Sequence, residues 1–231
     1  MNFLESTAED IHQYARSILY ETDESNLHSF EDTANYVVGK IYDDFLNHRG
    51  ERIFELVRIF RHVTEDDMPP EGQQDVPQAD HWLALSGTIG REKAWNSRLQ
   101  SAGHRLLPDD AFETPMLRAA LHQLGFTPDS DGFIRSLNDL SNYFHVEQAL
   151  GSPYIVAQEE FVKPYGIESV VGIGSMFASG AMFILIGFTS TPLNSAQAVK
   201  FSQLAPFIGT LLARYETTKY PTWQSTIYDH A

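Results

Sequence analysis

The sequence predicts an α+β fold, in which a single antiparallel sheet is combined with amphipathic helices. Two apolar segments, 167–177 and 182–188, are separated only by a short turn that ends at Gly180, which is typical of a β-hairpin. Amphipathic helical patterns lie near both ends of the chain. With 231 residues, of which 42% are apolar, the chain can bury one sizeable core.

The N-terminal part predicts two helices. Ser6 and Glu9 have the spacing of a capping box, and apolar residues then recur at helical spacing up to Leu19. A second apolar stripe runs from Ala34 to Leu46, and Gly50 is the stop signal for this helix. We expect the polar, acidic segment between the two helices to be a loop.

Two further strands are expected before residue 91. The segment 52–62 is rich in branched and aromatic side chains, which favours a strand over a short helix. The segment 81–90 has a strand pattern that ends in glycine-rich turns. Between them, residues 64–80 are rich in proline, glycine and acid, so this segment is expected to be a surface loop.

The later helices are marked by their termini. Pro115 is expected to open a short helix, for which Gly125 is the stop signal. Asn194 and Gln197 are expected to cap one final helix. An apolar stripe from 198 to 212 lies on that helix.

Composition excludes several classes of function. The chain has 31 acidic and 16 basic residues and a net charge of -15, and such a field repels phosphate backbones and anionic lipid. We therefore expect no binding of nucleic acid or of a membrane surface. The chain has no cysteine, which excludes thiolate nucleophiles, iron–sulfur clusters and thiolate-ligated haem, and fits a reducing compartment. Because no export signal or membrane-spanning stretch is visible, we expect a cytoplasmic protein.

Three segments carry a resemblance to a known family. They are LALSGTIGREKAWNSRLQSAGHRLLP, YFHVEQALGSPYIVAQEEFVKPYGIESVVGIGSMFASG and FILIGFTSTPLNSAQAVKFSQLAPFIGTLLA. Through them the chain, from about Ala34 to Tyr215, resembles bacterial GAF-like sensor domains of the type found in sensor histidine kinases. The second segment is the most specific, because it is too long and irregular to arise from strand or helix patterning alone.

The resemblance implies a GAF-like central antiparallel sheet, with the terminal helices packed on one face and a loop- and helix-rich pocket side on the other. It divides the chain into an N-terminal helical extension at 1–30, a GAF-like sensory domain at 31–216 and a polar tail at 217–231. It also implies a homodimer. We expect the dimer contact to involve the first helix or the exposed flank of the last one.

The chain departs from the family in the turn of the closing hairpin. Family members commonly have a proline in this turn and an acidic residue after its glycine, whereas this chain has Ala178 and Ala181. We expect no transmitter, DNA-binding or nucleotide-cyclase segment after Tyr215, and we therefore expect the domain to act through a downstream signalling protein.

The polar and aromatic middle of the chain supplies the candidate ligand-binding residues. Arg98 and Arg105 could clamp a carboxylate, nitrate or phosphate, although we favour their pairing with nearby acidic residues. Ser152, Tyr154 and Gln158 could line the mouth of the pocket or could form a turn. The full candidate set is Trp95, Arg98, His104, Tyr143, His145, Ser152, Tyr154 and Gln158.

The sequence leaves the cofactor open. His104 and His145 could each be an axial haem ligand, a metal ligand or a donor to a bound molecule, or a buried histidine that fixes a loop. Because neither has a second ligand at metal-binding spacing, we favour the structural role and predict no metal site. Gly172 and Gly174 suggest a dinucleotide fingerprint, but Phe177 stands in place of its third glycine and a strand follows. This favours close packing within a strand.

We expect a non-catalytic sensory module that binds a small molecule between its sheet and the segment 91–160. One alternative is a ligand-free dimerisation or scaffold domain. The other is an enzyme that uses His104 or His145 as an acid or base. The absence of cysteine excludes the redox chemistry of GAF-type methionine sulfoxide reductases.

Overall fold

A six-stranded antiparallel sheet forms the centre of the computed structural model, which describes residues 1–20, 22, 27–68, 79–101, 105–129, 132–135 and 142–221. The strand order is β3-β2-β1-β8-β7-β6. These strands are β1 (Phe54–Thr64), β2 (His81–Gly90), β3 (Leu106–Pro108), β6 (Tyr143–Val146), β7 (Ser169–Met176) and β8 (Met182–Thr189). A separate antiparallel hairpin is formed by β4 (Phe126–Asp129) and β5 (Gly132–Arg135). The predicted α+β class is confirmed.

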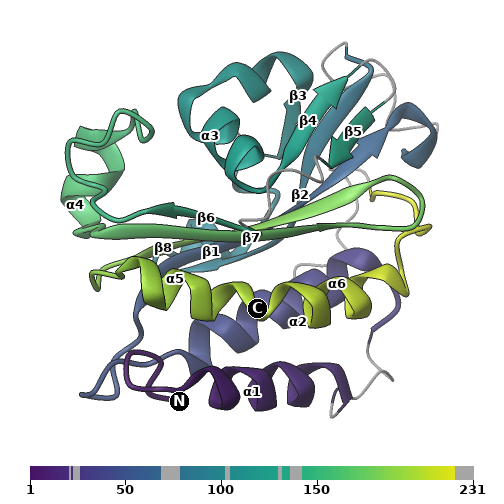
Figure 1. Cartoon of the computed structure of the whole chain (residues 1–231). Helices are drawn as coiled ribbons and strands as arrows, with labels where there is room; N and C mark the ends of the chain where they lie inside the picture. Colours follow the sequence, from purple (N-terminus) through teal and green to yellow (C-terminus); the bar gives the residue numbers. More distant parts are fainter. Residues whose placement is uncertain are drawn as a thin grey trace.

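The helices divide between the two faces of the sheet. They are α1 (Ala8–Tyr20), α2 (Phe30–Asp44), α3 (Pro115–Gln123), α4 (Lys163–Tyr165), α5 (Ser195–Ser202) and α6 (Ala205–Ala213). Helices α2, α5 and α6 cover one face, which we call the helix face, and α1 lies beyond them as an outer layer (Figure 1). Helix α3 and the β4–β5 hairpin lie on the opposite side of the sheet (Figure 1). No helix within the described ranges is long and apolar enough to cross a membrane.

Aromatic side chains fill the core of the helix face. The rings of Phe3, Phe45, Phe54 and Phe201 form contacts with centroids 4.9 to 6.2 Å apart. The start of the chain is held here because Lys200 Nζ donates to the carbonyl oxygens of Phe3 at 3.0 Å and of Ser6 at 2.7 Å. The apolar side of α1 belongs to the same core and packs against α5 and α6. The dimer contact expected for this helix stays a prediction.

A buried ion pair lies within the helix face. Arg61 Nε is 3.2 Å from Glu31 Oε1, and both side chains are almost completely buried. The two atoms attract as charges, but they are not aligned as a hydrogen bond. Glu31 Oε1 also accepts a hydrogen bond of 3.1 Å from Ser86 Oγ. Ser86 lies at a bulge, where the register between β1 and β2 shifts.

The segment after α6 completes the surroundings of Arg61. Arg61 Nη1 donates to the carbonyl oxygen of Thr218 at 3.0 Å. The guanidinium lies 4.8 Å from the ring centre of Phe30 and 5.4 Å from that of Tyr220. Tyr220 is itself buried, and its hydroxyl donates to the carbonyl oxygen of Leu85 at 3.0 Å. The end of the described chain is therefore fixed to the sheet.

The cap of α1 differs from the prediction by one residue. The reciprocal pair is Thr7 and Asp10: Thr7 N donates to Asp10 Oδ2 at 2.7 Å, and Asp10 N donates to Thr7 Oγ1 at 3.2 Å. The hydroxyl of Ser6 instead donates to the carbonyl oxygen of Phe3 at 2.7 Å. The predicted Ser6–Glu9 box is wrong. Ser6–Glu9 and Thr7–Asp10 have the same spacing in the sequence, but the Ser6 hydroxyl is bonded to Phe3, and the cap forms at Thr7.

The final helix is interrupted. Its predicted capping box is confirmed, because Gln197 N donates to Asn194 Oδ1 at 3.0 Å and Asn194 N donates to Gln197 Oε1 at 2.8 Å. The single helix predicted after it is wrong, since the chain forms α5 and then α6. Pro206 lies in the first turn of α6 and has no N–H to continue the hydrogen bonds of α5.

Glycines in β7 allow close packing. A Cβ at Gly172 would lie 3.0 Å from the carbonyl oxygen of Leu185. A Cβ at Gly174 would lie 2.8 Å from the carbonyl oxygen of Phe183 and 2.9 Å from the ring of Phe126. The predicted packing role of these glycines within a strand is confirmed.

Candidate ligand-binding site

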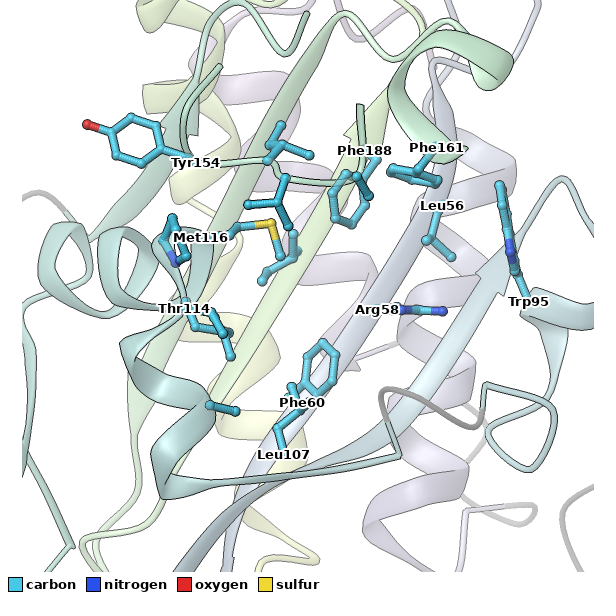
Figure 2. Close-up of a pocket in the computed structure, with 17 residues that line it drawn as sticks. Leu56, Arg58, Phe60, Trp95, Leu107, Thr114, Met116, Tyr154, Phe161 and Phe188 are labelled. Atoms are coloured by element: carbon cyan, nitrogen blue, oxygen red, sulfur yellow. The ribbon is translucent and has the colours of Figure 1, made fainter. Parts of the chain in front are cut away.

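A cavity of about 420 Å³ lies on the face of the sheet opposite the helix face, and we call this side the cavity face (Figure 2). Its floor is formed by β1 and β8, and its walls by residues 107–117, by residues 154–161 and by Trp95. The volume is within the range of small-molecule sites, which are typically apolar hollows with a few polar groups.

The alternation of β1 explains the floor. Leu56, Arg58 and Phe60 are alternate residues of one strand, so their side chains point to the same face of the sheet. In the pairing with β8, Leu56 lies opposite Phe188 and Arg58 lies opposite Ile186. The floor is therefore apolar apart from one guanidinium.

One wall is a loop that is held in shape by a side-chain amide. Gln158 Oε1 accepts a hydrogen bond of 2.8 Å from Gly151 N, and Gln158 Nε2 donates to the carbonyl oxygens of Ala149 at 3.1 Å and Ile155 at 2.7 Å. This loop presents Tyr154 to the cavity. Figure 2 shows the hydroxyl of Tyr154 directed away from the other lining residues. Gln158 thus shapes the wall without lining the cavity.

Trp95 forms part of the opposite wall. Thr88 Oγ1 donates to the carbonyl oxygen of Trp95 at 2.7 Å, which ties the 3₁₀ turn 93–96 to β2. The indole packs edge-on against the ring of Tyr165, with centroids 4.5 Å apart. A Cβ at Gly90 would lie 2.8 Å from the indole, so glycine is what permits this close approach.

Arg58 is the functional candidate that the sequence interpretation missed. Its side chain lines the cavity although the residue is only 8% exposed. Nη2 donates to Ser101 Oγ at a long 3.5 Å, and the buried Nε has no hydrogen-bond partner. No acidic group among the described residues forms an ion pair with it. Burial lowers the pKa of Arg58 to about 10, so the guanidinium remains charged at neutral pH.

Other predicted site residues lie elsewhere. Arg98 is buried against Tyr220, with its guanidinium 5.4 Å from the ring centre, and Nη1 donates to the carbonyl oxygen of Pro221 at 3.4 Å. Ser152 belongs to a turn, where its Oγ accepts a hydrogen bond of 3.3 Å from Tyr154 N. His104 lies outside the described residues.

Tyr143 and His145 point to the helix face. Tyr143 packs against the core of that face, whereas Phe144, between them in β6, packs on the cavity side. His145 Nε2 lies 2.9 Å from the carbonyl oxygen of Leu193, so this nitrogen carries the proton and donates. That contact fixes the loop before α5, as expected for a structural histidine. The ligand-binding role given to these residues stays a prediction, and the cavity does not include them.

A pair of histidines lies at the far end of β1. His62 Nε2 and His81 Nδ1 are 3.0 Å apart, and the His62 ring packs edge-on against Phe133 with centroids 5.0 Å apart. Burial, and then the neighbouring His81, lower the pKa of His62 to about 4. His62 is therefore neutral at neutral pH.

Comparison with known proteins identifies the fold. No protein-family model matches the chain, and no curated protein sequence matches it. The solved GAF domain from a phosphoenolpyruvate-protein phosphotransferase of Coxiella burnetii is similar over 90% of this chain and 96% of its own, with a TM-score of 0.50 and 14% identity. The chain has a GAF-like fold.

A second solved structure is similar to this GAF-like domain. It is the free methionine-R-sulfoxide reductase of Neisseria meningitidis, determined in complex with its substrate. The match covers 90% of each chain, with a TM-score of 0.51 and 9% identity. At such identities the likeness shows the fold alone. The more specific resemblance to domains of sensor histidine kinases stays a prediction.

Proposed function

We propose that this GAF-like domain is a non-catalytic sensory module, which binds a small molecule in the cavity and acts through a partner protein. The observation that carries the proposal is the cavity itself, an apolar hollow between the sheet and the segments that follow β2 and β6. A filled core on that side would have favoured a scaffold domain. The cysteine-free sequence supports a cytoplasmic location as part of the proposal.

The side chains that line the cavity support a binding role over catalysis. Its polar lining residues in the described part of the chain are Arg58, Thr114 and Tyr154. An arginine that remains protonated at neutral pH is a poor general base. The described lining contains no carboxylate or histidine that could accept a proton from a substrate in its place.

Thermal shift against a panel of metabolites, combined with native mass spectrometry of freshly purified protein, tests the proposal. A ligand that binds only the folded state must raise the melting temperature. The Ala111→Phe variant places a ring in the cavity wall and should abolish the response. Ala8→Phe, at the exposed first residue of α1, is the matched control and should respond like the wild type.

The same experiment separates the proposal from the scaffold alternative. If no metabolite shifts the melting temperature and no small molecule accompanies the purified protein, the domain does not sense through this cavity. Product formation from a bound metabolite would instead show an enzyme. Light scattering on the same samples tests the predicted homodimer.

A further inference from the structure

The charge inside the cavity restricts the chemistry of its ligand. Among the described residues that line it, Arg58 is the only charged one. Most of the other described lining residues are apolar or aromatic, and they include Phe60, Trp95, Phe161 and Phe188. A buried charge without a counter-charge costs several kcal/mol. A ligand that brings an opposite charge to this position would remove that cost.

The hydrogen-bonding capacity of Arg58 is largely unused. A guanidinium has five N–H donors. In the described part of the chain, Arg58 makes one hydrogen bond, the long 3.5 Å contact from Nη2 to Ser101 Oγ. Nε is buried and has no partner. The guanidinium therefore offers several donors in one plane, and among the described residues the protein supplies them with a single, distant acceptor, Ser101 Oγ.

We propose that the cavity binds a largely apolar molecule that carries one carboxylate, and that Arg58 binds this carboxylate. A single guanidinium matches one carboxylate in charge and in planar, two-pronged geometry. A phosphate dianion would leave a second charge among apolar walls, where no described lining residue can balance it. Figure 2 shows Arg58 extended toward the side of the cavity formed by Trp95, so the carboxylate end of the ligand lies there. This inference rests on the proposed function.

Isothermal titration calorimetry with three probes of one skeleton tests the inference. The probes are 4-phenylbutyrate, its neutral amide 4-phenylbutanamide and the dianionic 4-phenylbutylphosphonate, each tested up to millimolar concentration. The wild type should bind the carboxylate at least about tenfold more tightly than the amide. It should also prefer the carboxylate over the phosphonate.

Variants assign the preference to Arg58. Arg58→Met should make carboxylate and amide bind equally, because the apolar contacts remain and the charge is gone. Arg58→Lys should retain a weaker preference for the carboxylate, since an ammonium lacks the planar fork. The matched control Arg118→Met removes an exposed arginine of α3, paired with Glu113, and should leave all three affinities unchanged.

The stability of the free protein gives a second readout. Ligand-free Arg58→Met should melt at a higher temperature than the ligand-free wild type, because it no longer buries an unpaired charge. A lower melting temperature would show that Arg58 serves the fold and would overturn the inference.

The outcomes separate the ligand class from the proposed function. Equal binding of carboxylate and amide by the wild type overturns the inference while the sensory proposal stands. Absence of binding by all three probes also overturns the ligand class, and the metabolite panel then judges the sensory proposal independently. A preference for the carboxylate that survives in Arg58→Met would place the anion elsewhere and would likewise refute the assignment.

Discussion

Arg58 and Arg61 are both buried in strand β1, but they face opposite sides of the sheet. On the helix face, Arg61 lies beside Glu31, donates to Thr218 and packs against two aromatic rings. On the cavity face, Arg58 has one long hydrogen bond to Ser101 and no acidic partner among the described residues. Burial of an arginine therefore does not reveal its role. The groups that surround it do, because a compensated charge serves the fold and an uncompensated one is available to a ligand.

The largest expected effect concerns the compensated arginine. Arg61→Met leaves the carboxylate of Glu31 buried without its counter-charge, so the free energy of unfolding should fall by about 3–5 kcal/mol. Urea denaturation followed by circular dichroism measures the change. The control is Arg52→Met, which breaks an exposed ion pair with Asp43 and should cost less than about 1 kcal/mol.

One result would show that Arg58 and Arg61 do not differ in their roles. If Arg61→Met and Arg58→Met destabilise the protein equally, the two side chains are equivalent structural groups. The double variant Glu31→Gln/Arg61→Met sharpens the test. It should be more stable than Arg61→Met alone, since Glu31 then no longer leaves a buried carboxylate without Arg61 beside it.

The next effect concerns His62, a buried polar residue of the same strand that carries no charge at neutral pH. Its pKa in the folded protein is about 4, against an ordinary value of 6.5. The unfolded chain therefore takes up a proton at a higher pH than the folded protein does. The contribution of neutral His62 to the free energy of unfolding is therefore complete above about pH 6.5. It is lost as the pH falls toward 4, and the loss amounts to up to about 3 kcal/mol.

Unfolding free energies measured at several pH values between 7 and 4 test this prediction. The difference between wild type and His62→Gln should decrease as the pH is lowered, because the glutamine does not titrate. His48→Gln, at an exposed position, is the control and should follow the wild type across the range. A constant difference between wild type and His62→Gln would contradict the lowered pKa.

The smallest expected effect compares packing on the two faces. Ala198 in α5 is fully buried in the helix-face core, and a larger side chain there must displace its neighbours. Ala198→Leu should therefore cost about 1–3 kcal/mol. Ala111→Leu extends into the cavity and should change the stability by less than about 0.5 kcal/mol. Equal losses in urea denaturation would mean that the cavity face is as closely packed as the helix face.

The longer helices and strands followed from the sequence, because local chemistry specifies them, whereas the short strands β3 to β6 were not predicted. The strand 81–90, the closing hairpin and the Asn194–Gln197 cap depend on nearby residues, and the structure has them. Where the prediction failed, two local signals competed. Ser6 and Thr7 offered overlapping caps for α1, and Pro206 interrupted an apolar stripe that otherwise fitted one helix.

The site was less predictable, because a cavity depends on how residues distant in the sequence are arranged around an empty space, and no local pattern encodes that arrangement. Trp95 and Tyr154 were selected from the sequence and do line it. His145 was selected by residue type, but strand alternation points it to the helix face, where it bonds to Leu193. Arg58 was overlooked inside an apolar strand. An arginine that alternates with Leu56 and Phe60 was the available signal, since alternation places all three on one buried face.

The position of Thr218 has a consequence for the order of folding. Its hydroxyl accepts from the amide of Phe30 across 188 residues, and its carbonyl accepts from Arg61 across 157. Contacts of such separation close very long loops of the chain and form slowly. During synthesis, Arg61 emerges from the ribosome long before Thr218 does. We therefore expect the growing chain to carry an incompletely compensated charge in β1, and its helix face to reach full stability only after residue 218 is available.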